Sequence, residues 1–130
     1  MSNSIKQEVR FSGDPTEVYE LLMNSQQHAK FSGAPADVSS KVGGKVSCYG
    51  GQINAINVEL VPGCRIVQAW RAADWEEGEY SITTFTLAKD GEQTRLTFTQ
   101  NGVPEHCVDK ISNGWKNFYW EPMESALRGG

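Results

Sequence analysis

The residue types most often used in catalysis and metal binding are few and widely spaced in this sequence. Its two histidines, His28 and His106, fall in different segments, and neither has a second metal ligand at a helical or hairpin spacing. Three cysteines, Cys48, Cys64 and Cys107, are odd in number and far apart, which fits neither a disulfide framework nor a zinc knuckle. We therefore predict reduced thiols, no metal site and no cofactor.

Sequence signatures of nucleophilic or phosphate chemistry are missing as well. No GxSxG, P-loop or strand-linked GxGxxG pattern occurs. A Ser-His-Asp or Cys-His arrangement assembles in space and stays open at this stage. Glu59 is a candidate acid or base if it lies near the mouth of the sheet, because burial would raise its pKa. The acidic stretch 75–79 is either a solvated turn or an acid/base pair.

Composition and charge exclude several classes of protein. Hydrophobic residues make up 38% and charged residues 22% of the 130 positions, which suits one folded domain over 1–130. The net charge is −4 and the basic residues are scattered singly, so we expect no binding to nucleic acid or to an anionic membrane surface. The N-terminus has no apolar signal-peptide segment, and we predict a cytoplasmic protein.

The middle of the chain has the two-residue hydrophobic period of β-strands. Asp90-Gly91 marks a hairpin, and short connections make successive strands antiparallel neighbours. After the first strand, Asp14-Pro15-Thr16-Glu17 has the pattern of a helix cap, and a second short helix follows to Phe31. The strands are predicted at 5–11, near Val38, and at 45–49, 52–60, 65–71, 80–87 and 94–100.

The last third of the chain changes to the 3.6-residue period of a helix. Apolar residues recur at three- and four-residue steps from Val108 to Leu127, with a weak point at Gly114 and an expected kink at Pro122. One long amphipathic helix after a run of strands must cover a sheet face. The predicted fold class is α+β, with a curved antiparallel sheet of about six or seven strands around the C-terminal helix.

Strand alternation assigns one face of the sheet to the helix. The apolar residues that we assign inward are Ile66, Trp70, Phe85, Leu87, Leu96 and Phe98. The same face carries four polar residues: Gln68, Ser81, Thr83 and Gln100. Buried polar groups need partners, so these residues either bond to one another or line a cavity and orient a ligand.

Aromatic residues crowd the C-terminal helix. Trp115 and either Phe118 or Tyr119 suit the core, whereas at helical spacing Trp120 points elsewhere. Trp120 either packs onto a sheet edge or against loops, which we favour, or, if it is exposed, is a candidate for contact with a partner.

Six segments recur in the same order in one known group of proteins: 31–36, 42–45, 59–62, 66–71, 75–78 and 114–115. Through them the sequence resembles the C-terminal domain of the heat-shock protein 90 ATPase activators, a member of the START-like (SRPBCC) superfamily. The resemblance covers about Ile5 to Leu127. It implies the helix-grip fold and a cavity between sheet and helix, which in many members binds hydrophobic ligands and in some supports lyase or cyclase chemistry. The eukaryotic activators stimulate the chaperone's ATPase and carry an additional N-terminal domain, whereas this sequence begins directly at the first predicted strand.

Three functions follow as hypotheses. The first is the binding of a small hydrophobic molecule or lipid, with eight expected site residues: Gln68, Trp70, Thr83, Phe85, Leu96, Phe98, Trp115 and Tyr119. The second is a chaperone-binding module that acts through an exposed aromatic or apolar patch, with Trp120 or the loop 31–35 as candidates. The third is a cyclase-type enzyme, for which Glu59 and His28 are the candidate acid/base residues. A monomer or a weak homodimer suits each of them.

Overall fold

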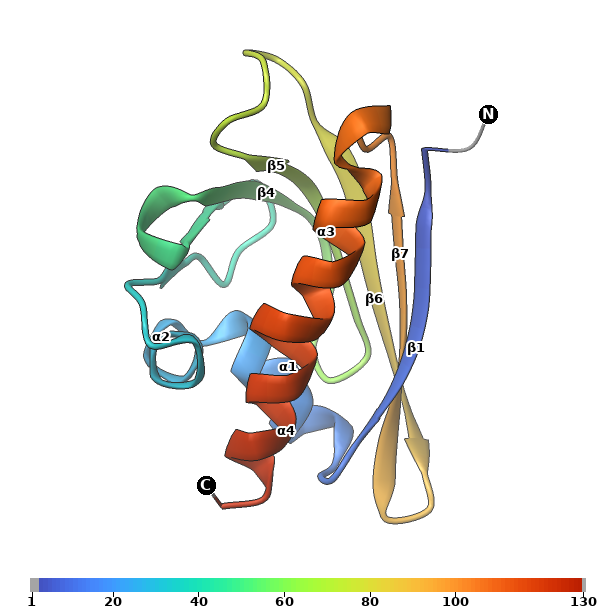
Figure 1. The fold of residues 1–130 in the computed structure, drawn as a ribbon. Helices are drawn as coiled ribbons and strands as arrows, with labels where there is room; N and C mark the ends of the chain where they lie inside the picture. Colours follow the sequence, from blue (N-terminus) through green and yellow to red (C-terminus); the bar gives the residue numbers. More distant parts are fainter. Residues whose placement is uncertain (1–2, 130) are drawn as a thin grey trace.

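The computed structural model describes residues 3–129 and shows an antiparallel sheet of seven strands (Figure 1). The order across the sheet is β1-β7-β6-β5-β4-β3-β2, so all neighbours except β1 and β7 are consecutive in the chain. The strands are β1 (Ile5–Phe11), β2 (Asp37–Val38), β3 (Lys45–Cys48), β4 (Ile53–Val61), β5 (Arg65–Ala72), β6 (Ser81–Asp90) and β7 (Gln93–Asn101).

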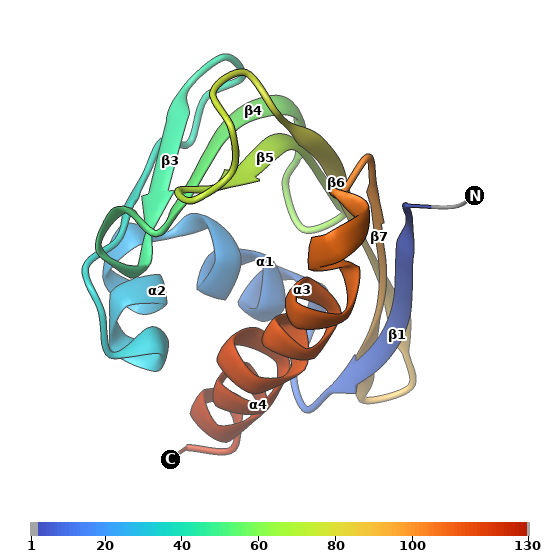
Figure 2. The same cartoon turned by 45° about the horizontal axis from the view of Figure 1, so that its top comes forward.

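The sheet curves around the C-terminal helical segment, with two further helices on the same side (Figure 2). This arrangement confirms the predicted fold class. Over the described residues, no helix has the length and apolar character needed to cross a bilayer. The helical elements are α1 (Pro15–Met23), α2 (Ser25–Ser32), η1 (Tyr49–Gly51), η2 (Glu105–Cys107), α3 (Val108–Trp115), η3 (Lys116–Trp120) and α4 (Glu121–Leu127).

The start of α1 is built as the sequence predicts. The Asp14 carboxylate accepts a 2.9 Å hydrogen bond from the Glu17 amide, and the Glu17 carboxylate accepts one of 3.1 Å from the Asp14 amide. Pro15 occupies the first turn, where its missing N–H is not needed. The helix therefore begins at a fixed point, and it packs Val18 and Leu22 against the concave side of the sheet.

The inward face of the sheet is also as predicted. The six apolar residues assigned to it are all buried, and the register places Phe85 opposite both Ile66 and Phe98 on the neighbouring strands. Leu87 lies opposite Leu96 in the same way. These cross-strand pairs form the floor on which the C-terminal helix packs.

The C-terminal helix contains a π-helical turn, η3, between α3 and α4. Pro122 has no N–H to donate to the carbonyl of Phe118, and that carbonyl instead accepts a hydrogen bond from the Tyr49 hydroxyl. The π-helical turn inserts one extra residue, which makes the buried face of the helix wider. Tyr119 and Trp120 are therefore both buried, while Phe118 is 59% exposed. Trp120 therefore lies in the core and is not exposed, and its indole N–H donates to Gln7 on the edge strand β1, so the packed alternative holds and the partner-contact alternative does not.

Candidate functional site

The eight residues predicted to bind a ligand are all buried between the sheet and the C-terminal helix, but they pack mostly against one another. The ring centroids of Phe98 and Trp115 are 4.5 Å apart, and those of Trp115 and Tyr119 are 4.7 Å apart. Thr83, Leu96 and Phe98 are fully buried, with no exposed surface. Together these residues form an aromatic core between the sheet and the helix.

The polar residues of the inner face are bonded to protein groups, which favours the structural alternative over a ligand-orienting role. Gln100 accepts a 2.8 Å bond from the Trp115 indole N–H and donates one of 2.9 Å to Ser81. Ser81 in turn donates to the Trp70 carbonyl at 3.0 Å. The Thr83 hydroxyl donates to the backbone carbonyl of Gln68 at 3.4 Å. The chain of bonds fixes the rings of the core in place.

Gln68 belongs to a second polar group nearer the edge of the sheet. Its side-chain amide donates a 3.1 Å bond to Asn57, which donates to the carbonyls of Ser39 and Lys41 at 2.7 and 3.1 Å. Asn57 precedes a β-bulge in β4, where the register shifts between Asn57 and Glu59. The amide pair therefore ties the 39–41 loop to the sheet.

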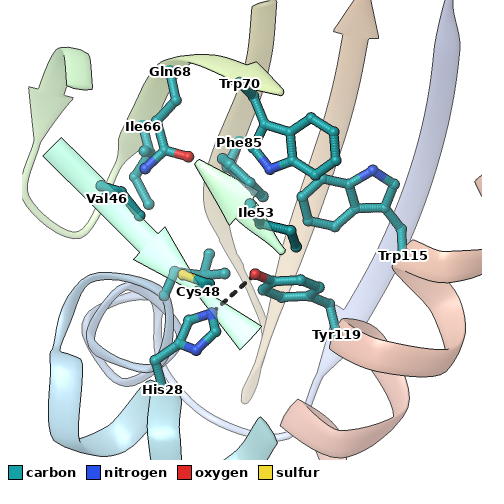
Figure 3. A pocket seen from close by; sticks show the side chains of 11 residues that line it. His28, Val46, Cys48, Ile53, Ile66, Gln68, Trp70, Phe85, Trp115 and Tyr119 are labelled. Atoms are coloured by element: carbon teal, nitrogen blue, oxygen red, sulfur yellow. Dashed lines mark hydrogen bonds between the residues drawn. The ribbon is translucent and has the colours of Figure 1, made fainter. Parts of the chain in front are cut away.

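A small cavity, the inner cavity, remains between the sheet and the helices, with a volume of about 20 Å³ (Figure 3). Its lining includes five of the predicted residues: Gln68, Trp70, Phe85, Trp115 and Tyr119. A space of this size holds about one water molecule. In this conformation it is too small for a hydrophobic ligand of the size expected for the sheet–helix cavity.

Three titratable side chains meet at the lower end of the inner cavity. The His28 Nε2 lies 3.0 Å from the Tyr119 hydroxyl, and the Cys48 side chain lies beside them at the end of β3 (Figure 3). Burial lowers the pKa of His28 to about 4 and raises the pKa of the Cys48 thiol to about 11. The pKa of Tyr119 is also raised well above its usual value by burial. All three groups are therefore neutral at pH 7, and Cys48 is poorly suited to act as a nucleophile.

The other candidates for acid/base chemistry lie apart from the inner cavity. Glu59 forms a 2.8 Å ion pair with Arg65, and both side chains are about half exposed (53% and 48%). The loop 73–80 is largely solvent-exposed except for Trp75, which is 7% exposed. Within residues 3–129, no three His, Cys, Asp or Glu side chains are grouped so as to hold a metal ion.

A second and larger hollow, the outer pocket, has a volume of about 360 Å³. It lies between α3–η3 and the segments 49–53 and 70–75, and it shares Ile53, Trp70, Trp115 and Tyr119 with the lining of the inner cavity. Its volume falls within the range of ligand pockets, about 300–1,000 Å³. Only three of its fourteen lining residues, Trp70, Trp115 and Tyr119, are among the predicted site residues. The eleven that the sequence did not indicate include Tyr49, Gln52, Trp75, Ile111 and Phe118.

Tyr49 joins the outer pocket to the helix. It is the one non-glycine residue with a positive φ, 53°, among the described residues, and Gly50 and Gly51 follow it in the same backbone region. Its ring packs against Phe118 and Tyr119 with centroids 5.9 and 5.7 Å away, and its hydroxyl bonds to the helix backbone. Left-handed backbone at a bulky residue is strained and is held by its surroundings. The Gly-Gly pair was the signal for a turn here, but it carried no information on where Tyr49 points.

Comparisons with known proteins agree with the fold and the resemblance. The family described as "Activator of Hsp90 ATPase homolog 1-like protein" matches residues 13–128. An activator of 90 kDa heat shock protein ATPase homolog from Dictyostelium discoideum is 33% identical over 116 residues, covering 88% of this chain and 30% of that protein. The human homolog 1 is 28% identical over 120 residues, covering 92% of this chain and 36% of that protein. The chain thus spans about a third of the length of these relatives.

Solved structures extend the comparison. The crystal structure of an HSP90 activator from Plasmodium falciparum superposes with a TM-score of 0.90 and 25% identity, covering 96% of both chains. The solution structure of an Aha1 dimer from Colwellia psychrerythraea gives a TM-score of 0.81 at 18% identity, covering 95% of both chains. The second likeness shows a shared fold.

Proposed function

Because the chain belongs to the family of Activator of Hsp90 ATPase homolog 1-like proteins, we propose that it binds a 90 kDa heat-shock chaperone and stimulates its ATPase. The observation that carries the proposal is the match to the Plasmodium falciparum HSP90 activator over 96% of both chains. The family match over residues 13–128 supports it independently of that structure. The chain corresponds to about a third of the length of its curated relatives. We therefore propose only the chaperone contact that the matching part of such a relative would make.

The outer face of the sheet offers a surface for such a contact. Ile56 on β4 and Ile82 on β6 flank Ala69 on β5 in one cross-strand row, and both isoleucines are about 40% exposed (37% and 42%). The bulge places Val58, 50% exposed, beside this row. Contiguous exposed apolar side chains on a sheet face are typical of interaction surfaces. We propose this sheet-face patch as the chaperone contact, in place of the buried Trp120.

An ATPase assay tests the proposal. Purified 90 kDa chaperone is titrated with the protein at micromolar concentration, and hydrolysis is followed against a chaperone-only control. We expect the rate to rise and saturate, and we expect Ile82→Glu to abolish the increase. Thr99→Glu, on the same face of the sheet and opposite Lys6, is the matched control and should act like the wild type. An unchanged hydrolysis rate at saturating wild-type protein rules out the activator function.

Ligand binding is the second candidate, and the outer pocket is the observation that favours it. Native mass spectrometry of the protein purified from its own host tests this function directly. A bound mass supports it, whereas a clean apo mass removes the support for a resident ligand.

A further inference from the structure

We propose that the outer pocket is a binding site for a compact, uncharged aromatic molecule. The proposal rests on the second candidate function, and it assigns the ligand to the outer pocket, between α3–η3 and the segments 49–53 and 70–75, and not to the inner cavity. It also gives the site a chemical preference, which the following features of the outer pocket define.

The walls of the outer pocket are mainly aromatic. Trp70 and Trp75 meet edge to face with centroids 5.5 Å apart, and Trp115 lies 5.6 Å from Trp70. Phe118 stands at the pocket with more than half of its surface exposed. Planar rings pack well against such faces and edges, which offer large contact area with few rotatable bonds.

A helix glycine leaves room in the wall. Gly114 lies inside α3, and its φ is not in the left-handed region. A Cβ added there would meet only Phe118, at an ordinary van der Waals distance of 3.8 Å. Glycine is a poorer helix former than alanine, and neither the backbone nor the packing requires it at this position. Its visible effect is to leave the outer pocket open along the helix.

Size and charge narrow the class of ligand. The pocket adjoins the inner cavity through Ile53, Trp70, Trp115 and Tyr119, which line both. That cavity measures only about 20 Å³, so it adds no room for a long acyl chain beyond the pocket itself. Asp74 and Lys110 form a 3.8 Å ion pair at the pocket, and both side chains are largely exposed. Opposite charges in water give little net attraction to an ion. These features favour a short ring system without a charge.

The aromatic walls of the outer pocket are held in place by hydrogen bonds within the protein, which form without a ligand. Arg71 donates a 2.6 Å bond to the Trp75 carbonyl, and Gln100 holds the Trp115 indole. Tyr49 is tied to the carbonyl of Phe118. A pocket whose walls are fixed before binding loses less conformational entropy when it is filled.

The test is a titration followed by two-dimensional NMR of the tryptophan indole N–H groups, with 2-naphthol, 2-naphthoate and palmitate as probes. We expect 2-naphthol to shift the Trp70 and Trp75 signals in a saturable manner. The Trp120 signal should stay in place, since its N–H bonds to Gln7 at 2.6 Å away from the outer pocket. The charged 2-naphthoate should bind about tenfold more weakly, because its carboxylate would lose hydration without gaining a partner.

Variants of the helix supply the controls. Gly114→Leu should weaken 2-naphthol binding by about tenfold or more by filling the pocket, and Gly114→Ala should weaken it less while raising the melting temperature. Asn113→Leu, exposed and outside the pocket lining, should bind as the wild type does.

Each contrary result overturns a defined part of the proposal. Equal binding by wild type and a folded Gly114→Leu variant overturns the location. Saturable binding of palmitate but not of 2-naphthol overturns the ligand class while leaving a ligand-binding function in place. No response to any of the three probes overturns the site itself, and the native mass spectrum then decides separately whether a ligand binds elsewhere.

Discussion

His28 and Tyr119 meet inside the protein with the imidazole Nε2 3.0 Å from the phenol oxygen, although 91 positions separate them in the chain. The contact joins α2 to the π-helical turn η3. His28 is 1% exposed, and its Nδ1 has no hydrogen-bond partner within the described part of the chain. A proton added to this ring would therefore place a charge in the core with one nitrogen unpaired.

Acid should destabilise the protein through His28. Burial lowers its folded-state pKa to about 4 from an ordinary value of 6.5, so between these pH values the unfolded chain holds a proton that the folded protein does not. The stabilisation is complete above pH 6.5 and is lost as the pH falls toward 4, for a total of about 3 kcal/mol. Urea unfolding at pH 7.5, 5.5 and 4 measures it.

Two variants isolate this effect from other titrating groups. The difference in unfolding free energy between wild type and His28→Leu should shrink as the pH falls, because leucine takes up no proton. His106→Gln, at an exposed position, should keep the pH dependence of the wild type. A wild-type to His28→Leu difference that is constant with pH would contradict the prediction.

Two aromatic residues of the π-helical turn, Trp120 and Phe118, should differ in how much their replacement by alanine lowers the free energy of unfolding. Trp120 is 6% exposed and donates to Gln7, so Trp120→Ala should cost about 3–5 kcal/mol. Phe118→Ala, at a side chain 59% exposed, should cost less than about 1 kcal/mol. Thermal or urea unfolding compares the two, and the reverse order would mean that the helix is regular through 116–120.

This pair also shows where the sequence stops being informative. The helical period and Pro122 predict a long helix with an irregularity near its end, both of which the structure has. A π-helical turn inserts one residue into the repeat, and the choice between a kink and such a turn depends on tertiary partners. The partner here, the Tyr49 hydroxyl, comes from the turn η1, 69 positions away.

For the strands and the site, too, the sequence predicts some features and leaves others open. A period of two is local, so the buried faces of β5, β6 and β7 follow directly from the sequence. The hydrogen-bond partners of Gln68 and Gln100 do not follow from the sequence, since a buried amide on an inner face is equally compatible with a ligand and with a protein partner. The outer pocket was missed because the loop conformations of Tyr49 and Trp75 decide it, and turn residues predict the presence of a loop without its direction.

The hydrogen-bond chain in the core should make Gln100 sensitive to substitution. Gln100→Leu leaves the Trp115 N–H without its acceptor and removes the donor to Ser81. The unpaired indole N–H costs about 1–3 kcal/mol and the lost bond to Ser81 about 1 kcal/mol, so we expect a loss of about 2–4 kcal/mol. Thr99→Val, next in sequence but on the opposite face, should change stability by less than about 0.5 kcal/mol. Equal effects in urea unfolding would show that the amide is not bonded in the core.

The three thiols should react with DTNB in an order set by burial. Cys64 is exposed and Cys107 is half-buried, whereas Cys48 is 3% exposed and its pKa is raised to about 11 by burial. At pH 8 only about one Cys48 side chain in a thousand would be thiolate, the reactive form. We expect Cys64 to react first, Cys107 more slowly, and Cys48 only when the protein unfolds. Peptide mass spectrometry after timed labelling gives the order, and Cys64→Ser should remove the fastest phase alone. Labelling of Cys48 under native conditions at a rate near that of Cys107 would show that the strand β3 and the Tyr49 turn open readily, and it would contradict the burial of the Cys48 thiol.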